Sequence, residues 1–108
     1  MKDVVFMGDS LVRIRAFPAG VRQDIGFQID TVQRGKKPDD WKPVNSVGKG
    51  VREIRTRDAS GQYRVVYLAN FKDAVHMLHA FQKKTQRTRR ADLDLARERL
   101  KQVRRRYG

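Results

Sequence analysis

Hydrophobic and polar positions alternate strictly in the middle of the chain. In residues 51–57, Ile54 points to one side of a strand, while Glu53, Arg55 and Arg57 point to the other. Small and polar residues at 58–62 form a turn, and residues 63–68 are rich in the β-branched and aromatic side chains that favour strands. The pattern predicts a hairpin with one charged face that meets solvent or a ligand. Arg64 is the only charge on its second strand.

Helical spacing of apolar residues recurs before and after this hairpin. A first strand is expected at residues 3–8, followed by a helical turn that Asp9 or Ser10 caps. A second helix ends near Gly35, and residues 88–107 form an amphipathic C-terminal helix loaded with arginine. The apolar positions of these two helices are Val21, Ile25, Ile29 and Val32, and then Leu93, Ala96, Leu100, Val103 and Tyr107.

The remaining segments predict a loop and a third strand of the meander. Residues 36–50 contain two prolines and two glycines and are expected to cross over as a loop into the sheet. Trp41 in this loop is expected to anchor against the core, with base stacking as the alternative. Residues 71–73 make a turn, and residues 74–81 form the third strand of an antiparallel meander.

The net charge of the chain indicates which class of molecule it is expected to bind. The 108 residues fit one domain, and 25 Lys and Arg against 12 Asp and Glu give a net charge of +13. Residues 1–40 carry 7 basic and 6 acidic side chains (+1), whereas residues 41–108 carry 18 and 6 (+12). A polyanion is the expected partner, and its binding surface belongs to the second part. Cysteine is absent, which excludes disulfides, a thiolate nucleophile and a Cys-based zinc site. No apolar stretch approaches the ~20 residues of a membrane span, so a soluble, cytoplasmic protein is expected.

The element order and three motifs resemble the RelE/HigB superfamily of bacterial toxins, most closely its HigB-like, phage-related branch. The motifs lie in VREIRTRDASGQYRVVYLA and in the following HMLHAFQKKTQRT. The resemblance implies one α+β domain over residues 1–108, with a RelE-like β-α-α-β-β-β-α order, a small antiparallel-rich sheet, N-terminal helices and a C-terminal helix. It also implies the toxin of a type II toxin-antitoxin system, a ribosome-dependent mRNA endoribonuclease silenced by a cognate antitoxin. Two departures are Arg89, where relatives often carry proline, and the lack of a tyrosine just after the Lys83-Lys84 pair.

Metal-free RNA cleavage needs a proton acceptor for the 2′-hydroxyl, charge at the pentacoordinate phosphate and a proton for the leaving 5′-oxygen. Arg64 is the first candidate for the phosphate clamp, because a guanidinium matches phosphate oxygens and stays charged, and Arg55 is its expected partner. Lys83 and Lys84 at the strand end are candidates for binding phosphate and for proton transfer. Lys84 is expected to group with Arg55 and Arg64 on the sheet. His79, which has the strand parity of Lys83, is a further acid–base candidate.

Other arginines are candidates for general RNA binding. They are Arg52, Arg57, Arg87, Arg90, Arg104 and Arg105. Structural alternatives stand beside these roles: Arg57 can pair with Glu53, and Arg64 can pair with Asp58 or Glu53. His76, on the opposite parity from His79, is expected to be a half-buried structural imidazole, and Tyr63 and Tyr67 are expected in the core. With two histidines and scattered acidic residues, neither a metal site nor any other cofactor is expected.

Two other function classes stay open. One is a non-catalytic nucleic-acid-binding protein such as a small phage regulator, and the other is a toxin homologue that binds an antitoxin without cutting RNA. Under the toxin hypothesis, the expected partners are a small helix-turn-helix antitoxin, the ribosome and mRNA. Binding to a membrane is not expected.

Overall fold

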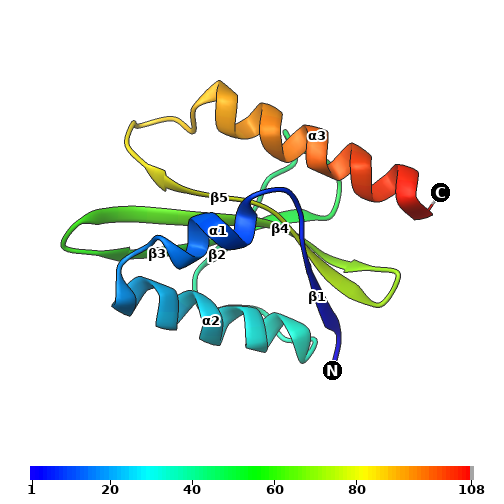
Figure 1. Cartoon of the computed structure of the whole chain (residues 1–108), viewed down its shortest axis with the longest axis horizontal. Coiled ribbons are helices and arrows are strands. Elements are labelled where there is room, and N and C mark those ends of the chain that lie inside the picture. Colours follow the sequence, from blue (N-terminus) through cyan, green and yellow to red (C-terminus); the bar gives the residue numbers. More distant parts are fainter. Residues whose placement is uncertain (108) are drawn as a thin grey trace.

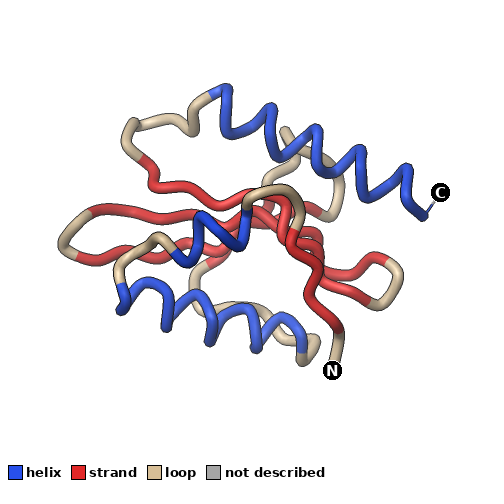
Figure 2. Tube along the Cα trace, viewed as in Figure 1, coloured by secondary structure: helices blue, strands red, loops and turns tan. Residues whose placement is uncertain are grey.

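The computed structural model describes residues 1–107 and shows a mixed sheet with helices on both faces (Figure 1). The elements are β1 (Asp3–Phe6), α1 (Ser10–Arg15), α2 (Ala19–Gln33), β2 (Trp41–Pro43), β3 (Val51–Asp58), β4 (Gly61–Phe71), β5 (Ala74–Lys83) and α3 (Arg90–Tyr107). The five strands are ordered β1-β5-β4-β3-β2, with β1 parallel to β5 and the other neighbours antiparallel. Figure 2 shows the loops that connect them, including the segment from β5 to α3.

The expected α+β class is therefore confirmed, with one strand more than expected. The segment at 36–50 was expected to be a loop, but Trp41 pairs with Ile54 and forms the short strand β2 at the edge of the sheet. Pro38 and the two glycines lie outside this strand, whereas Pro43 is its last residue. A strand of only three residues that includes a proline is difficult to recognise from the sequence. Trp41 is half-buried and belongs to neither hydrophobic core, so the expected core anchor is wrong. Arg52 and Lys37 lie over its ring, at 4.7 and 5.3 Å from the centroid.

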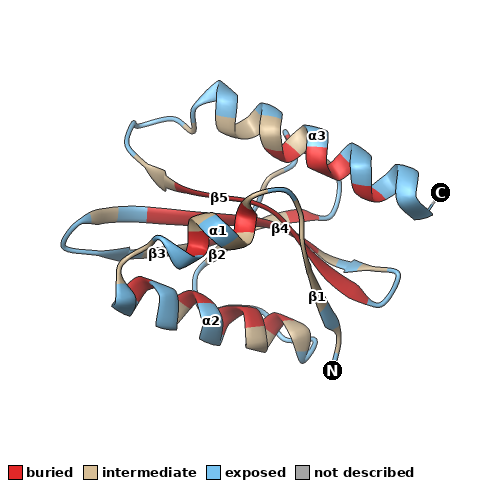
Figure 3. Ribbon diagram, viewed as in Figure 1, coloured by how far each residue is buried: buried red, intermediate tan, exposed pale blue. Residues whose placement is uncertain are grey.

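The sheet separates two hydrophobic cores. On one face, α1 and α2 pack against residues that include Ile54, Tyr63, Val65 and Tyr67. Both tyrosines are buried there, as expected. On the other face, the apolar stripe of α3 packs against a cluster that includes Val66, Leu68, Leu78 and Phe81. Figure 3 shows burial concentrated in the centre of the sheet, while the tip of the β3–β4 hairpin is exposed.

A β-bulge in β5 changes which side chains share a face. Val66 pairs with His79 and Tyr67 pairs with Met77, so Leu78 is an extra residue in β5. Because of this insertion, His76 and His79 both lie on the α3 face, and the expectation of opposite faces is wrong. His76 is buried rather than half-buried, with its Nε2 3.1 Å from the carbonyl oxygen of Phe71.

The C-terminal helix covers only part of its face of the sheet. Ala96, Leu100 and Val103 are buried under it and Leu93 packs against the same cluster, which confirms these four positions of the predicted stripe. Tyr107, the fifth predicted position, is exposed, so the stripe ends before the last turn of the helix. In Figure 1 the helix runs above the sheet and leaves the protruding end of the β3–β4 hairpin uncovered. None of the helices in the described part of the chain has the length and apolar character needed to cross a membrane.

Candidate functional site

Cationic side chains of three neighbouring strands share the open face of the sheet. In the register, Arg55 on β3 lies opposite Arg64 on β4, and two residue pairs further along, on the same face, Arg57, Gln62 and Lys83 form a row. Paired residues in adjacent strands point to the same face. The structure thus brings Arg55 and Arg64 together as the sequence predicted, on the face that α3 covers elsewhere.

Glu53 occupies the space between the two paired arginines. Its Oε1 lies 3.9 Å from Arg55 Nε and 3.8 Å from Arg64 Nε, and its side chain is only 12% exposed. Of the alternatives for Arg64, the pairing with Glu53 forms. Asp58 instead accepts hydrogen bonds from the backbone and hydroxyl of Ser60. The carboxylate reduces the repulsion between two guanidinium groups held side by side.

Arg64 and Arg55 differ in their access to a ligand. The side chain of Arg64 is 4% exposed, and its guanidinium donates to the carbonyl oxygen of Tyr63 (3.1 Å) and to Gln62 Oε1 (2.8 Å). Burial, and then the charge of Arg55, lower the pKa of Arg64, while Glu53 opposes the shift. Arg55 is one-third exposed, and its buried Nε has no hydrogen-bond partner among the described residues. Arg55 therefore retains unused donor capacity.

These residues line two hollows that meet at Arg55. The first, of about 420 Å³, lies over the hairpin and includes Arg57, Gln62 and Arg64. The second, of about 440 Å³, lies between residues 42–46, the sheet, and residues 86–88. Glu53, Arg55, Arg57, Arg64 and Lys83 define what we call the cationic cleft. Such a cleft concentrates positive potential and suits an anionic polymer.

The two lysines at the end of β5 take different positions. Lys83 is the last residue of β5 and lines the second hollow together with Glu53 and Arg55. Lys84 is exposed beyond the strand and lines neighbouring hollows without Arg55. The expected grouping of Lys84 with Arg55 and Arg64 is therefore not what the structure shows. Lys83 takes that place.

The candidate RNA-binding arginines are dispersed. Arg57 and Arg87 line the cationic cleft. Arg57 is exposed, and the described partners of Glu53 are Arg55 and Arg64, so the alternative pairing of Arg57 with Glu53 does not form. Arg52 lies over Trp41 on the other face of the sheet. The last three candidates are exposed on α3, outside the cleft: Arg90, Arg104 and Arg105.

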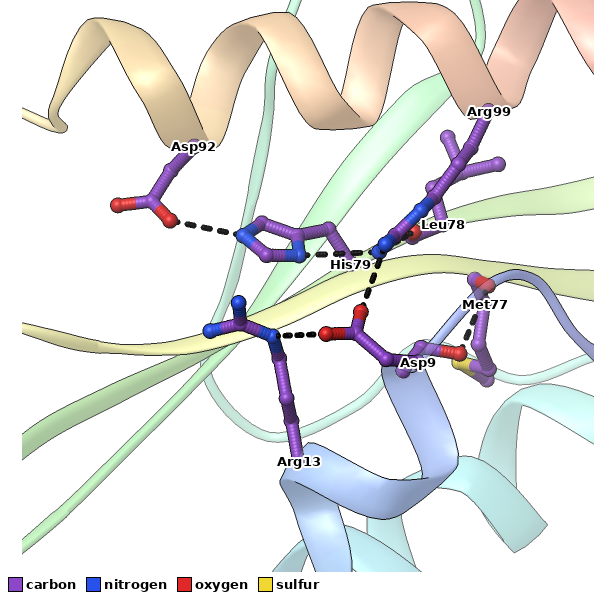
Figure 4. A network of polar contacts seen from close by, with 8 residues as sticks. Asp9, Arg13, Met77, Leu78, His79, Asp92 and Arg99 are labelled. Atoms are coloured by element: carbon purple, nitrogen blue, oxygen red, sulfur yellow. Dashed lines mark hydrogen bonds and ion pairs between the residues drawn. The ribbon is translucent and has the colours of Figure 1, made fainter.

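His79 lies outside the cleft, in a buried polar network that Figure 4 shows from close by. Arg99 donates to His79 Nδ1 (3.2 Å), to the carbonyl oxygen of Leu78 (3.0 Å) and to Asp9 Oδ1 (2.6 Å). A guanidinium only donates, so Nδ1 of His79 accepts, and Nε2 carries the proton that it donates to Asp92 Oδ1 (2.8 Å). Burial lowers the pKa of His79 and favours this neutral form. Both ring nitrogens are engaged, and neither faces the cleft.

A comparison with known protein families shows to which family the chain belongs. Residues 13–101 match the model of the family described as Phage derived protein Gp49-like (DUF891). The chain belongs to this Gp49-like family. The family is of the general RelE/HigB-like toxin type, which agrees with the motifs in the sequence and with the α+β sheet. No curated protein matches the chain.

In this Gp49-like chain, Glu53 is the cleft residue to which the sequence pattern gave no chemical role. The alternation of residues 51–57 already placed Glu53 on the same face as Arg55. A single carboxylate on a face of several cations was the signal that could have indicated a chemical role for Glu53. The structure adds its contact with Arg64 from the next strand. Within residues 1–107, no group of three His, Asp or Glu side chains is arranged to hold a metal ion.

Proposed function

We propose that this Gp49-like protein is the toxin of a type II toxin-antitoxin system, of the HigB-like branch, and that it cleaves mRNA on the ribosome without a metal ion. The observation that carries this proposal is the Arg55–Arg64 cross-strand pair beside Glu53 on an open face of the sheet. Membership of a phage-derived family supports the same reading.

The cleft offers a group for each need of RNA cleavage. Glu53 accepts the proton of the 2′-hydroxyl, whose oxygen attacks the adjacent phosphorus. The bond from phosphorus to the 5′-oxygen breaks, and Lys83 donates a proton to that oxygen. The products are a 2′,3′-cyclic phosphate and a 5′-hydroxyl. His79 is not needed for either proton, because its nitrogens serve Asp92 and Arg99.

The arginines stabilise the charge on the pentacoordinate phosphate in two ways. Arg55 is accessible enough to contact a phosphate oxygen directly. Arg64 lies beside it, almost covered, and adds a fixed positive charge that costs no reorganisation during the reaction. Both effects require that Arg55 and Arg64 stay opposite each other on the neighbouring strands β3 and β4.

The ribosome supplies the geometry that the open cleft lacks. In-line attack requires the 2′-oxygen, phosphorus and 5′-oxygen to be aligned, and proximity with correct orientation accounts for much of such a barrier. The cleft meets RNA from one side of a sheet, so we expect slow cleavage of free RNA and fast cleavage of ribosome-bound message.

The proposed toxin acts in the cytoplasm and is silenced by a cognate antitoxin, expected to be a small helix-turn-helix protein with an acidic and apolar segment. The net charge of +13 attracts such a segment over long range, and apolar contacts then slow its dissociation. The association rate of the purified pair should fall steeply as salt rises. A rate independent of salt contradicts this electrostatic account.

Cleavage in a purified translation system tests the function. Message ends are mapped by primer extension for the wild type, for Arg55→Ala and for Arg22→Ala, an exposed arginine on α2 that serves as the matched control. We expect Arg55→Ala to slow cleavage by about 10²–10³-fold and Arg22→Ala to leave it unchanged. Intact message with the wild-type protein contradicts the proposal.

One observation favours a second candidate, a non-catalytic homologue that binds nucleic acid or an antitoxin. The hydrogen bonds of Arg64 to Tyr63 and Gln62 satisfy it as a structural side chain. In that case the protein binds RNA or the antitoxin with a strong salt dependence but leaves ribosome-bound message intact. The cleavage assay therefore separates the two candidates.

A further inference from the structure

A separate hollow of about 350 Å³ lies at the edge of β5, next to the cationic cleft. β1 pairs only with the first part of β5, up to Met77, and the hollow lies beyond that point, between α1 and the start of α3. Its main side chains are Arg13, Phe17, Phe81, Lys84, Arg89 and Asp92. Phe81 lies opposite Arg64 in the register, which places the hollow one strand away from the paired arginines.

Asp92 brings a carboxylate with an available oxygen to this hollow. Its Oδ1 accepts from His79, whereas its Oδ2 has no hydrogen-bond partner among the described residues. Figure 4 shows Oδ2 turned away from the imidazole. The donor at His79 is neutral, so it orients the carboxylate without cancelling its charge. Asp92 is therefore a fixed acceptor in an otherwise cationic surrounding.

We propose that this hollow binds a guanine base of the RNA whose phosphate occupies the cationic cleft, an inference that rests on the proposed function. Guanine presents adjacent N1–H and N2–H donors, which suit the Asp92 carboxylate. Its other edge presents the O6 and N7 acceptors that Arg and Lys bind, and Lys84 and Arg89 line the same hollow.

The other bases fit this hollow less well. Adenine carries an amino donor at position 6, where it would meet cations instead of an acceptor. Cytosine and uracil lack the second ring and its N7. The aromatic rings of Phe17 and Phe81 provide apolar contact for a flat base. A volume of about 350 Å³ is at the lower end for small-molecule sites and suits one nucleotide.

Binding of the four ribonucleoside 5′-monophosphates to the isotope-labelled full chain, followed by NMR, tests the site without any cleavage. We expect guanosine monophosphate to bind about tenfold more tightly than the others and to shift the signals of Lys84, Arg89 and Asp92. In Asp92→Asn an amide donor replaces the available oxygen, so the preference should be lost. Asp94→Asn, an exposed carboxylate of the same helix, is the matched control and should keep it. Equal affinities for all four nucleotides, or shifts confined to other surfaces, overturn the proposal.

Two further variants keep the outcome clear. If Asp92→Asn unfolds, Arg89→Gln provides a second test, because it leaves the His79 network intact. This variant should weaken the binding of guanosine monophosphate several-fold. An unchanged affinity overturns the site. Arg55→Ala should slow cleavage by about 10²–10³-fold and keep guanosine binding. A wild type that binds guanosine monophosphate but cuts no message refutes the proposed function alone. Cleavage ends mapped on ribosomes should be enriched next to guanine. If guanosine monophosphate binds but the ends show no such enrichment, the site takes a free nucleotide and the assignment to RNA is overturned.

Discussion

Replacing Gly8 by alanine should destabilise the fold through the buried network. Gly8 has φ +53°, and a Cβ there would lie 2.5 Å from Arg99 Nε and 2.6 Å from its Cζ. Arg99 would have to move away, because carbon and nitrogen atoms do not approach so closely. Its guanidinium is held by Asp9, Leu78 and His79, so movement breaks these hydrogen bonds.

The cost can be worked from these contacts. A left-handed backbone costs an alanine about 1 kcal/mol. The bonds of Arg99 to Leu78 and His79 contribute about 1 kcal/mol each, and the bond to Asp9 contributes about 1 kcal/mol because that carboxylate is 44% exposed and partly screened. The sum predicts a loss of about 3–5 kcal/mol in the free energy of unfolding.

Urea unfolding followed by circular dichroism measures this loss. Gly26→Ala is the matched control, because nothing lies within 4 Å of a Cβ at Gly26 in α2. That substitution should be neutral or stabilise by up to about 1 kcal/mol. A loss below about 1 kcal/mol in Gly8→Ala would refute the reasoning, since Arg99 would then have an alternative position of equal energy.

Three further predictions concern the cleft and the network. Glu53→Gln should slow cleavage of ribosome-bound message by about 10²–10⁴-fold while the protein still binds ribosomes, and a rate within a few-fold of wild type rules out Glu53 as the base. Lys83→Ala should slow cleavage at least about tenfold more than Lys84→Ala, and the reverse order would place Lys84 in the cleft. Burial lowers the pKa of His79 below 6.5, so the unfolded chain takes up a proton first as the pH falls, and the free energy of unfolding should decrease below about pH 6.5. His79→Gln keeps a donor for Asp92 and should lessen this decrease, which urea unfolding measures from pH 7.5 to about 5. If the free energy of unfolding of His79→Gln depends on pH as that of the wild type does, other groups cause the decrease.

The sequence predicts most of the fold because its elements are long and strongly patterned. The alternation in residues 51–57 is a property of one strand and of the core that it faces. The spacing of three and four residues in α3 is likewise a property of one helix. Both predictions hold because neither needs information from distant parts of the chain. The bulge at Leu78 could not be predicted, because it depends on the register of β5 against β4. The strand at Trp41 was missed because its pairing with β3 comes from tertiary structure.

The sequence predicted only the part of the candidate site that lies on two consecutive strands of one sheet face. Arg55 and Arg64 follow from alternation and a tight turn, and they lie opposite each other. Lys84 was grouped with them because the sequence does not show that β5 ends at Lys83. The surroundings of His79 depend on α1 and α3, far away in the sequence, so the parity that it shares with Lys83 did not reveal its burial.

The placement of the acidic residues leaves much of the positive charge of this chain uncompensated. Residues 41–108 carry only six carboxylates, and two of these are held at interior positions, Glu53 between arginines and Asp92 beside His79. These two shape the cleft and the neighbouring hollow but do little to neutralise the outer face of α3, where Arg104 and Arg105 stay exposed. Repulsion among such exposed cations lowers stability and is relieved when phosphates or acidic side chains approach. We propose that a nucleic acid or an acidic antitoxin completes the charge balance that the folded chain leaves open, and either partner should raise its resistance to urea most at low salt.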